Sequence, residues 1–464
     1  MSRDTKRQLS WYQVDDTQAV ARHLERMAAK GWLLEGIDNW FFRYRRAQPV
    51  QARYAVTFFP EASIYDARLT EGQETYIDYC RAAGWELAAA YGPIQYFRAL
   101  RPDAVPIETD EAVKLTAIRR TMRKTTVLSY GLLLALPAIV LPMDLFQFRR
   151  EPLEFLSSRA SLSQALLMVG IALFSILILG DYLLWVLRSR RSVAGGGRCA
   201  RPHTRFRLGL SAVMLALCAY TVWIHLTDPA IPGLQNYLLL YLALYGGIML
   251  LSRALLRFLK RRGYKRANIR GGMIAFALAA GLAGALAIPA LSIGLNGAGV
   301  LRLGREPAEV YRYTDPDGPT FTWDIYRDPL PITLEALGYS VAPEDHCTYE
   351  AEVSRSFLAA YSQYTQRPMG WGSELPSSMA YGVCRIRWPW LLERAWETLL
   401  AEEERPWWTE LERLEPAPWG AEEAWQRESP ATCFLRYPDR IVTMDLWSGV
   451  TPGQQEAIAL TLAP

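Results

Sequence analysis

Three cysteines in the C-terminal third of the chain are the residues whose type and spacing come nearest to chemistry. Cys347, Cys384 and Cys433 all follow the last long apolar run, and His346 stands beside the first of them. Outside the cytoplasm, thiols can form lasting disulfides. Because three is an odd number, we expect at most one bridge among these cysteines and one remaining thiol. His346 beside Cys347 suggests a metal ligand, but no C-x-x-C or H-x-x-x-H spacing accompanies it. We therefore predict no metal and no cofactor.

Aromatic residues of the N-terminal region could form a pocket for a small ligand. Glu35 or Glu86 would anchor the polar end of such a ligand, because binding pockets are mostly apolar with a few placed polar groups. The alternative is that these aromatic side chains simply form the core of the domain. The aromatic candidates are Trp32, Trp40, Phe42, Trp85, Tyr96 and Phe97.

Asp181 is the one acidic residue that we expect to be buried within the apolar runs. It stands about two helical turns from the end of the second run. A carboxylate inside a membrane is a functional candidate by default. However, Asp181 is also near enough to Arg188 and Arg190 in sequence to reach the membrane surface, and this structural interpretation is the one we favour.

Five long apolar runs position all of these residues. Each supplies roughly 18 to 26 mostly apolar residues, which is enough helix to cross a hydrocarbon core about 30 Å thick. None shows a charged stripe at helical spacing, so buried helices of a soluble protein are disfavoured. We predict five transmembrane helices, at about residues 126–143, 162–187, 208–226, 237–256 and 271–295.

The charges of the loops predict the orientation. Arg and Lys residues are concentrated before the first run and in the second and fourth loops, whereas the third loop, 228–236, has neither. The positive-inside rule then places the N-terminus in the cytoplasm, and five spans leave the C-terminal region outside. Residues 300–464 carry 14 basic and 26 acidic groups and no lysine. The first dozen residues lack an apolar segment, so we expect no cleavable signal peptide.

The N-terminal region contains two copies of one unit, at residues 11–47 and 52–99. The Gly31-Trp32 and Gly84-Trp85 pairs stand 53 positions apart, and each copy has a late Phe-Arg pair, at 42–43 and 97–98. Each copy predicts a strand, a helix that ends at the glycine, and two further strands, with the first strand of the first copy at 11–14. We expect one antiparallel sheet with both helices on one face, which is an α+β fold.

Several sequence stretches resemble a known family. The segments 28–35, 41–44, 53–60, 79–86 and 105–111 together look like the bacterial family catalogued as domain of unknown function 2812, over about residues 10 to 115. Residues 327–338 are similar to a segment that recurs outside the membrane in some members. The resemblance implies a multi-span protein of the bacterial cytoplasmic membrane, often encoded near small winged-helix repressors. It implies no catalytic residue.

The C-terminal region reads as a folded α+β domain. It holds ten of the sixteen tryptophans. Alternating and turn-bounded patterns predict strands at 320–326, 357–364, 378–387, 433–437 and 440–447. An amphipathic helix is expected at 389–404, with proline in its first turn, and a last helix opens at Thr451.

These patterns favour a non-enzymatic membrane protein with a sensory or regulatory role. We expect an N-terminal cytoplasmic α+β domain at 1–112, a transmembrane block at 113–299 and an extracytoplasmic α+β domain at 300–464. The first domain would bind a small ligand or a protein partner, or the chain would form a homo-oligomer. Besides the lipid bilayer we expect no nucleic-acid partner. The alternatives are an envelope enzyme with its site around the outer cysteines, or an exporter subunit held through small residues of the fifth span, Ala277, Gly281 and Ala285.

Overall fold

A computed structural model of the chain describes most of its 464 residues. The chain forms two compact units, which are treated separately. The first consists of Met1–Pro137, Gly170–Leu217 and Leu239–Gly294, and the second of Ala138–Val169, Cys218–Leu238 and Leu295–Pro464. The described residues are 4–9, 16–38, 41–101, 103–107, 110–227, 234–297, 305–314, 320–342, 345–369, 378–404, 411–427, 432–446 and 450–462, without the side chains of 234–241 and 285–297.

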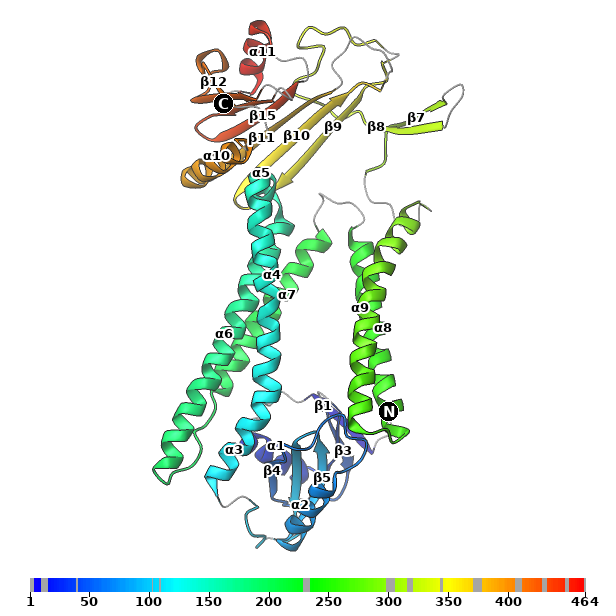
Figure 1. Ribbon diagram of the computed structural model, residues 1–464, viewed down its shortest axis with the longest axis vertical. Helices are drawn as coiled ribbons and strands as arrows, with labels where there is room; N and C mark the ends of the chain where they lie inside the picture. Colours follow the sequence, from blue (N-terminus) through cyan, green and yellow to red (C-terminus); the bar gives the residue numbers. More distant parts are fainter. Residues whose placement is uncertain are drawn as a thin grey trace. The chain divides into compact units, whose positions relative to one another are not determined.

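The N-terminal domain contains the order strand, helix, strand, strand twice (Figure 1). The first copy is β1 (Thr5–Leu9), α1 (Thr17–Ala29), β2 (Trp32–Asp38) and β3 (Phe41–Arg46). The second copy is β4 (Tyr54–Phe58), α2 (Glu71–Ala82), β5 (Trp85–Tyr91) and β6 (Ile94–Ala99). The strand predicted at 11–14 lies outside the described residues, and β1 lies earlier in the chain.

Both helices begin and end as their sequences predict. The Asp16 side chain caps α1 by accepting from the Ala19 N–H at 3.2 Å, and Thr70 forms a capping box with Gln73 at the start of α2. After each helix a glycine adopts positive φ, 78° at Gly31 and 91° at Gly84. Only glycine takes this conformation without a Cβ penalty, so these two positions turn the chain from helix into strand.

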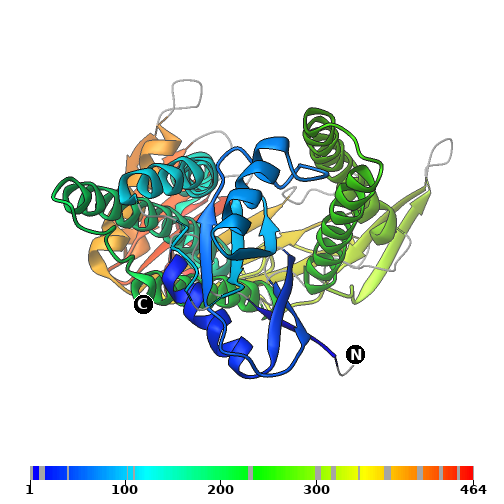
Figure 2. The same cartoon turned by 90° about the horizontal axis from the view of Figure 1, so that it is seen from below.

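The two copies form two three-stranded antiparallel sheets, and the prediction of a single sheet is wrong. The strand orders are β1-β3-β2 and β4-β6-β5, so the first, third and second strands are arranged alike. In Figure 2 the first copy is dark blue and the second a lighter blue. Because the strands of each copy pair only with one another among the described residues, each sheet closes within its own unit.

The 53-residue offset holds through both hairpins. Trp32 pairs with Arg46 as Trp85 pairs with Ala99, and each hairpin carries an irregularity at the same place, after Leu34 and after Leu87. The predicted alignment of the two Phe-Arg pairs is therefore shifted by two residues, because Phe97 corresponds to Tyr44. Position 42, a phenylalanine in the first copy, is occupied by Gln95 in the second.

A shared apolar core joins the two copies. It contains Leu24 of α1, Phe42 of β3, Val56 of β4 and Tyr96 of β6, all buried. A second cluster lies under α2 and includes Ile77, Cys80, Trp85 and Phe97. Burial of this kind contributes roughly 1.5–3 kcal/mol for each large apolar side chain.

Among the residues that the structure describes, five helices are long and apolar enough to cross a membrane. The first span is one continuous helix, in which α3 (Glu111–Met122), a π-helical turn (Arg123–Val127) and α4 (Leu128–Arg150) follow one another. The other spanning helices are α6 (Arg159–Ala194), α7 (Thr204–Thr227), α8 (Leu234–Arg261) and α9 (Arg266–Gly297). Each contains most or all of one predicted apolar run, so the chain is a multi-pass membrane protein.

The C-terminal domain is built on a seven-stranded antiparallel sheet of order β12-β13-β14-β15-β11-β10-β9 (Figure 1). A separate hairpin, β7 (Glu309–Thr314) and β8 (Thr320–Ile325), precedes it. The strands are β9 (Thr348–Arg355), β10 (Ala359–Arg367), β11 (Met379–Ile386), β12 (Leu411–Leu414), β13 (Glu423–Arg427), β14 (Thr432–Arg436) and β15 (Arg440–Leu446), and the helices are α5 (Pro152–Ser157), α10 (Pro389–Glu403) and α11 (Pro452–Leu462), with a 3-10 turn at Ala417–Trp419.

Helices cover the two faces of this sheet. One face packs on α11, through Ile458 and Leu462, and on the turn around Leu334. The other packs on α10 and on α5, through residues such as Trp396 and Leu153. Thus five of the predicted strands and both predicted helices occur in the C-terminal domain. Strands β7, β9, β12 and β13 were not predicted.

Candidate functional site

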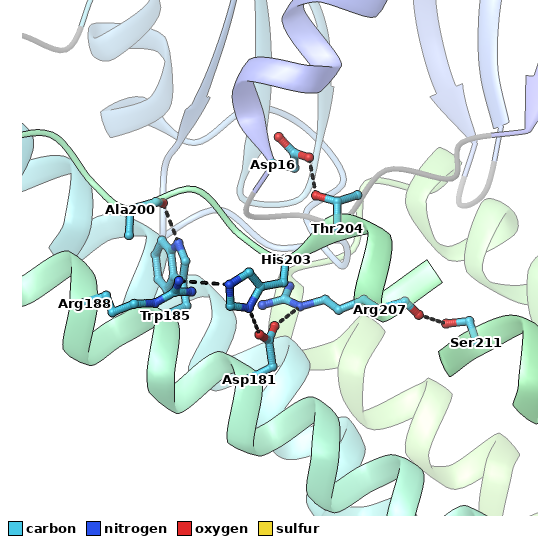
Figure 3. Close-up of polar contacts among 9 residues, drawn as sticks. All are labelled: Asp16, Asp181, Trp185, Arg188, Ala200, His203, Thr204, Arg207 and Ser211. Carbon is cyan, nitrogen blue, oxygen red and sulfur yellow. Dashed lines mark hydrogen bonds and ion pairs between the residues drawn. The ribbon is translucent and has the colours of Figure 1, made fainter. Parts of the chain in front are cut away.

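A buried charged cluster lies where α6 and α7 meet (Figure 3). Asp181 of α6 accepts from Nε of Arg207 at 2.5 Å and from Nδ1 of His203 at 2.7 Å. The side chains of Asp181 and Arg207 are only 4% and 2% exposed. Buried charges are stable only when they are paired and hydrogen-bonded, so the two residues depend on each other.

The hydrogen-bond partners of Asp181 are residues other than Arg188 and Arg190, the arginines named with it in the sequence analysis. Its partners come from the following loop and helix, and Arg188 instead lies 2.9 Å from Nε2 of His203. A guanidinium can only donate hydrogen bonds. Nε2 of His203 must therefore accept, and Nδ1 carries the proton that it donates to Asp181. This geometry assigns a neutral imidazole between a carboxylate and a cation.

The cluster is connected to the N-terminal domain through the next residue. Thr204, the first residue of α7, donates from its hydroxyl to Oδ2 of Asp16 at 2.6 Å. The other oxygen of Asp16 caps α1. One carboxylate thus holds the start of α1 and the start of α7 together.

An apolar cluster strengthens this junction. Trp185 of α6 is 1% exposed and packs with Phe58 of β4 and with Leu115, Ile118 and Met122 of α3. Its ring nitrogen donates to the Ala200 carbonyl at 2.8 Å (Figure 3). Trp185 thus docks α6 on the N-terminal domain.

The predicted ligand-binding residues do not come together around one cavity. Phe42 and Tyr96 lie in the shared core, and Trp85 and Phe97 lie in the cluster under α2. Trp32 packs at the border of the shared core and lies under Lys6. Their burial among apolar side chains fits the alternative, in which these residues form the core.

The two predicted polar anchors, Glu35 and Glu86, each lie beside an arginine. Glu35 lies 3.9 Å from Arg43, and Glu86 lies 2.6 Å from Arg98. Both pairs lie at the surface, where ion pairs contribute little. Trp40 lies outside the described residues.

A groove does exist in the N-terminal domain, at a different place. It runs along the edge strand β4 and beneath the first turns of α1, and Trp85 is the only predicted ligand residue among those described that lines it. Arg53 and Lys114 bring two cations to its wall. The other lining residues are Thr17, Gln18, Ala21, Tyr54, Ala55, Val56, Thr57, Pro106 and Ile107.

The three C-terminal cysteines are free thiols in the structure. Cys384 pairs with Ile441 and belongs to the face covered by α10, whereas Cys433 pairs with Met444 and belongs to the opposite face. Cys347 precedes β9, and four strand intervals of about 4.8 Å separate β9 from β14. Bridged cysteines need Cα atoms within about 7 Å, so the sheet disagrees with the predicted disulfide.

Sequence reasoning missed a second buried acid, Asp144 of α4. It is 7% exposed and accepts from the Gln164 side chain at 3.1 Å. Asp144 follows the predicted first span directly, so we assigned it to a loop. The signal that could have found it is the run from Leu145 to Phe148, which continues the helix beyond the aspartate.

Comparison with known proteins identifies only the N-terminal region. The family described as 'protein of unknown function (DUF2812)' matches residues 16–130 of the chain. The N-terminal region is thus similar to this family over the matched residues. No curated protein and no solved structure matches the chain.

The DUF2812 match confirms the family resemblance found in the sequence, and it covers both helices of the repeated unit. It begins at Asp16, the residue that caps α1, and ends within α4. The groove along β4 therefore lies inside the DUF2812 region. Asp181, His203 and Arg207 lie beyond it, as does the whole C-terminal domain.

Proposed function

We propose that the chain is a non-enzymatic, sensory or regulatory membrane protein whose N-terminal domain is coupled to helices α6 and α7. The observation that carries the proposal is the hydrogen bond between Asp16 and Thr204. It ties the first turn of α1 to the residue that follows His203 in the charged cluster. A displacement of the first turn of α1 would therefore either move the start of α7 or break this hydrogen bond.

The groove along β4 suits the input side of such coupling. Thr17 and Gln18 line it and follow Asp16 directly. A ligand or partner segment in the groove would press on the first turn of α1, and Asp16 would carry the displacement to Thr204. The cations Arg53 and Lys114 favour an anionic group in this position.

The output side is the pair of spanning helices. Asp181 and Arg207 hold α6 to α7 through a buried ion pair, and separating the two groups would leave each charge buried without this partner. In the proposed mechanism, the ion pair between Asp181 and Arg207 has two states, bonded and broken, and each state corresponds to one arrangement of α6 and α7. Bistable contacts of this kind are what regulatory transitions use.

The proposed orientation follows from the loop charges, with the N-terminal domain and the basic loops in the bacterial cytoplasm and the C-terminal domain outside. Residues 125–299 carry 18 basic and 5 acidic groups, whereas residues 300–464 carry an excess of acid. This asymmetry supports insertion in the cytoplasmic membrane by the positive-inside rule.

Thiol chemistry in the C-terminal domain receives no support from the state of its cysteines. Burial raises the pKa of Cys384 to about 12 and the pKa of Cys433 to about 11. Burial likewise raises the pKa of Cys347 to about 11. Since the thiolate is the reactive form, these residues suit a structural role, and the non-enzymatic function is favoured.

Hydrogen exchange of the full-length protein in lipid nanodiscs tests the coupling. Thr204→Val removes the hydroxyl that binds Asp16 and keeps the shape of the side chain. We expect faster amide exchange in the first turn of α1 as well as at the start of α7. Thr116→Val is the matched control, because Thr116 bonds only within α3, to Ala112. Unchanged exchange in α1 of the Thr204 variant would remove the basis of the proposal.

The regulatory role itself is tested by capture from native membranes. The intact protein, purified in mild detergent, should retain a stoichiometric protein or small molecule that mass spectrometry can identify. The Thr204→Val variant should retain less of it, since the coupled state is weakened. Recovery of the protein alone in both cases would contradict a role that depends on a bound partner or ligand.

A further inference from the structure

Three arginines stand side by side across the sheet of the C-terminal domain. Ala360 of β10 pairs with Arg355 of β9 on one side and with Arg385 of β11 on the other. Arg385 in turn pairs directly with Arg440 of β15. Directly opposed residues of antiparallel strands point to the same face, so the three guanidinium groups belong to one face of the sheet.

This arrangement is unfavourable without a compensating anion. Like charges on directly opposed strand positions are destabilising. Arg440 bonds both oxygens of Asp439, at 2.8 and 3.0 Å, and this contact, with a further contribution from Arg385, lowers the pKa of Asp439. Neither Arg355 nor Arg385 forms an ion pair with any described residue. One carboxylate therefore faces three cations, in a domain that is acidic overall.

A cavity of about 530 Å³ lies above this row. Its lining includes the three arginines together with Ser362, Tyr364 and Thr461. The side chain between Arg355 and Arg385 is Ala360, which leaves the space between the two guanidinium groups open. The hydroxyl groups and the guanidinium groups of Arg355 and Arg385 are donors suited to an oxyanion, whereas Arg440 already donates to Asp439 and to the Leu462 carbonyl and contributes chiefly its charge.

The row lies close to the point where a spanning helix begins. Arg159, the first residue of α6, donates to the Arg355 carbonyl at 2.7 Å, and the Ser356 hydroxyl donates to the Leu156 carbonyl at 2.5 Å. Phe357 follows at the tip of the turn with 70% of its surface exposed. These contacts keep the end of β9 beside the first turn of α6, which is the second candidate spanning helix.

We propose that the cavity lined by Arg355, Arg385 and Arg440 binds a phosphate-bearing anion. The phosphate would lie over Ala360, between the guanidinium groups of the flanking strands, with Ser362 and Thr461 as further donors. Two sources offer this group, the headgroup of an anionic phospholipid and a soluble phosphate. Either one would neutralise the row and link the strands β9, β11 and β15.

The test uses the delipidated full-length chain in detergent. Three probes are added separately: dioleoyl phosphatidylglycerol, dioleoylglycerol, which lacks the phosphate, and inorganic phosphate. Native mass spectrometry counts bound lipid, and thermal unfolding measures stabilisation by each probe. We expect a saturable rise in unfolding temperature with phosphatidylglycerol or with inorganic phosphate, and none with dioleoylglycerol. Stabilisation by the lipid alone assigns the headgroup as source, and stabilisation by inorganic phosphate assigns a soluble ligand.

Substitutions of single arginines test whether the bound anion contacts the row of Arg355, Arg385 and Arg440. Arg385→Gln and Arg355→Gln should each weaken binding about tenfold, the loss expected for one charge-assisted hydrogen bond. Arg387→Gln is the matched control, because Arg387 lies over Trp388 and does not line the cavity.

Measuring the unfolding temperature of each variant without a probe distinguishes lost binding from misfolding. Arg385→Gln relieves the repulsion with Arg440, so its unfolding temperature without probe should equal or exceed that of the parent chain, while the rise caused by the probe is lost. The proposal is overturned if Arg355→Gln and Arg385→Gln bind like the parent, if Arg387→Gln weakens binding equally, or if dioleoylglycerol binds as well as phosphatidylglycerol.

Discussion

Asp181 accepts hydrogen bonds from one residue of the following loop and one of the following helix, and each bond holds the carboxylate in the position that the other bond requires. Arg207 supplies the charge that balances the buried carboxylate, and His203 occupies the second oxygen. Sequence reasoning singled out Asp181 from its position in an apolar run. It could not name the partners, because Arg207 is 26 residues away and only helix packing brings it near.

Substitution of Asp181 by Asn should destabilise the protein strongly. Arg207 would lose the buried carboxylate that it faces, and breaking a buried ion pair costs about 3–5 kcal/mol. Thermal unfolding in detergent measures the effect. The double variant Asp181→Leu with Arg207→Met should recover most of the loss, because it removes both charges together. If the double variant is as unstable as the single one, the ion pair is not the source of the stability.

The buried thiols should resist alkylation in the folded protein. Burial raises the pKa of Cys384 to about 12 and that of Cys433 to about 11, so almost no thiolate is present at pH 8. We expect iodoacetamide to modify both residues only after unfolding, as followed by peptide mass spectrometry. Rapid modification of either residue in the native state at pH 8 would contradict this.

The same shifts predict how stability depends on pH. The folded pKa values lie above the ordinary value of 9.0, so the folded state holds these protons more tightly. The contribution to stability is fully present below about pH 9 and declines as the pH rises toward 11 to 12. Replacing both cysteines by alanine should flatten that decline in a pH series of thermal unfolding.

The repeated helix ends show what local patterns can predict and what they cannot. Both glycines after the helices were placed correctly, because a helix end followed by an aromatic strand is a local signal. The division into two sheets was missed, because pairing between strands depends on contacts that the order of elements does not specify. Strands β12 and β13 were missed for another reason, since they are short and lack a clear alternation of apolar residues, whereas β9 alternates (Tyr349, Ala351, Val353) and was overlooked.

Substitution of either glycine by alanine should destabilise the N-terminal domain, but not equally. Both positions have positive φ, which costs about 1–2 kcal/mol for a residue with a Cβ atom. A Cβ atom at Gly31 would also lie 2.7 Å from the Ala47 carbonyl oxygen, whereas at Gly84 the nearest atoms are 3.3 Å away. Gly31→Ala should therefore be the more harmful change in urea unfolding. Equal losses would show that the contact with Ala47 relaxes freely.

The proposed five spans would place the two ends of the chain on opposite sides of the membrane. The apolar runs predicted these helices well, because a membrane span needs length and composition rather than long-range contacts. The seven-stranded sheet and the charged cluster could not be predicted in the same way. Each depends on residues separated by many positions, such as Asp16 and Thr204.

The proposed orientation gives a prediction for the whole chain. Alkaline phosphatase fused after Pro464 should be active in bacterial cells, because that enzyme needs the space outside the cytoplasm, and green fluorescent protein fused there should be dark. Fusions before Met1 should give the opposite pair of results. A fusion after Arg262, in the basic fourth loop, serves as the internal control and should behave like the N-terminal fusion. Equal behaviour of both termini would rule out five spans.

The exchange of Phe42 for Gln95 between the two copies bears on where water first enters the N-terminal domain. Gln95 is fully buried, and neither of its amide atoms has a hydrogen-bond partner among the described residues. A buried polar group in this state costs about 1–3 kcal/mol, and hydration relieves that cost. Local opening should thus begin in the second copy, around β6, while the first copy stays closed behind its aromatic ring. The two copies of the unit should therefore differ in how readily they open locally, with the second copy opening first.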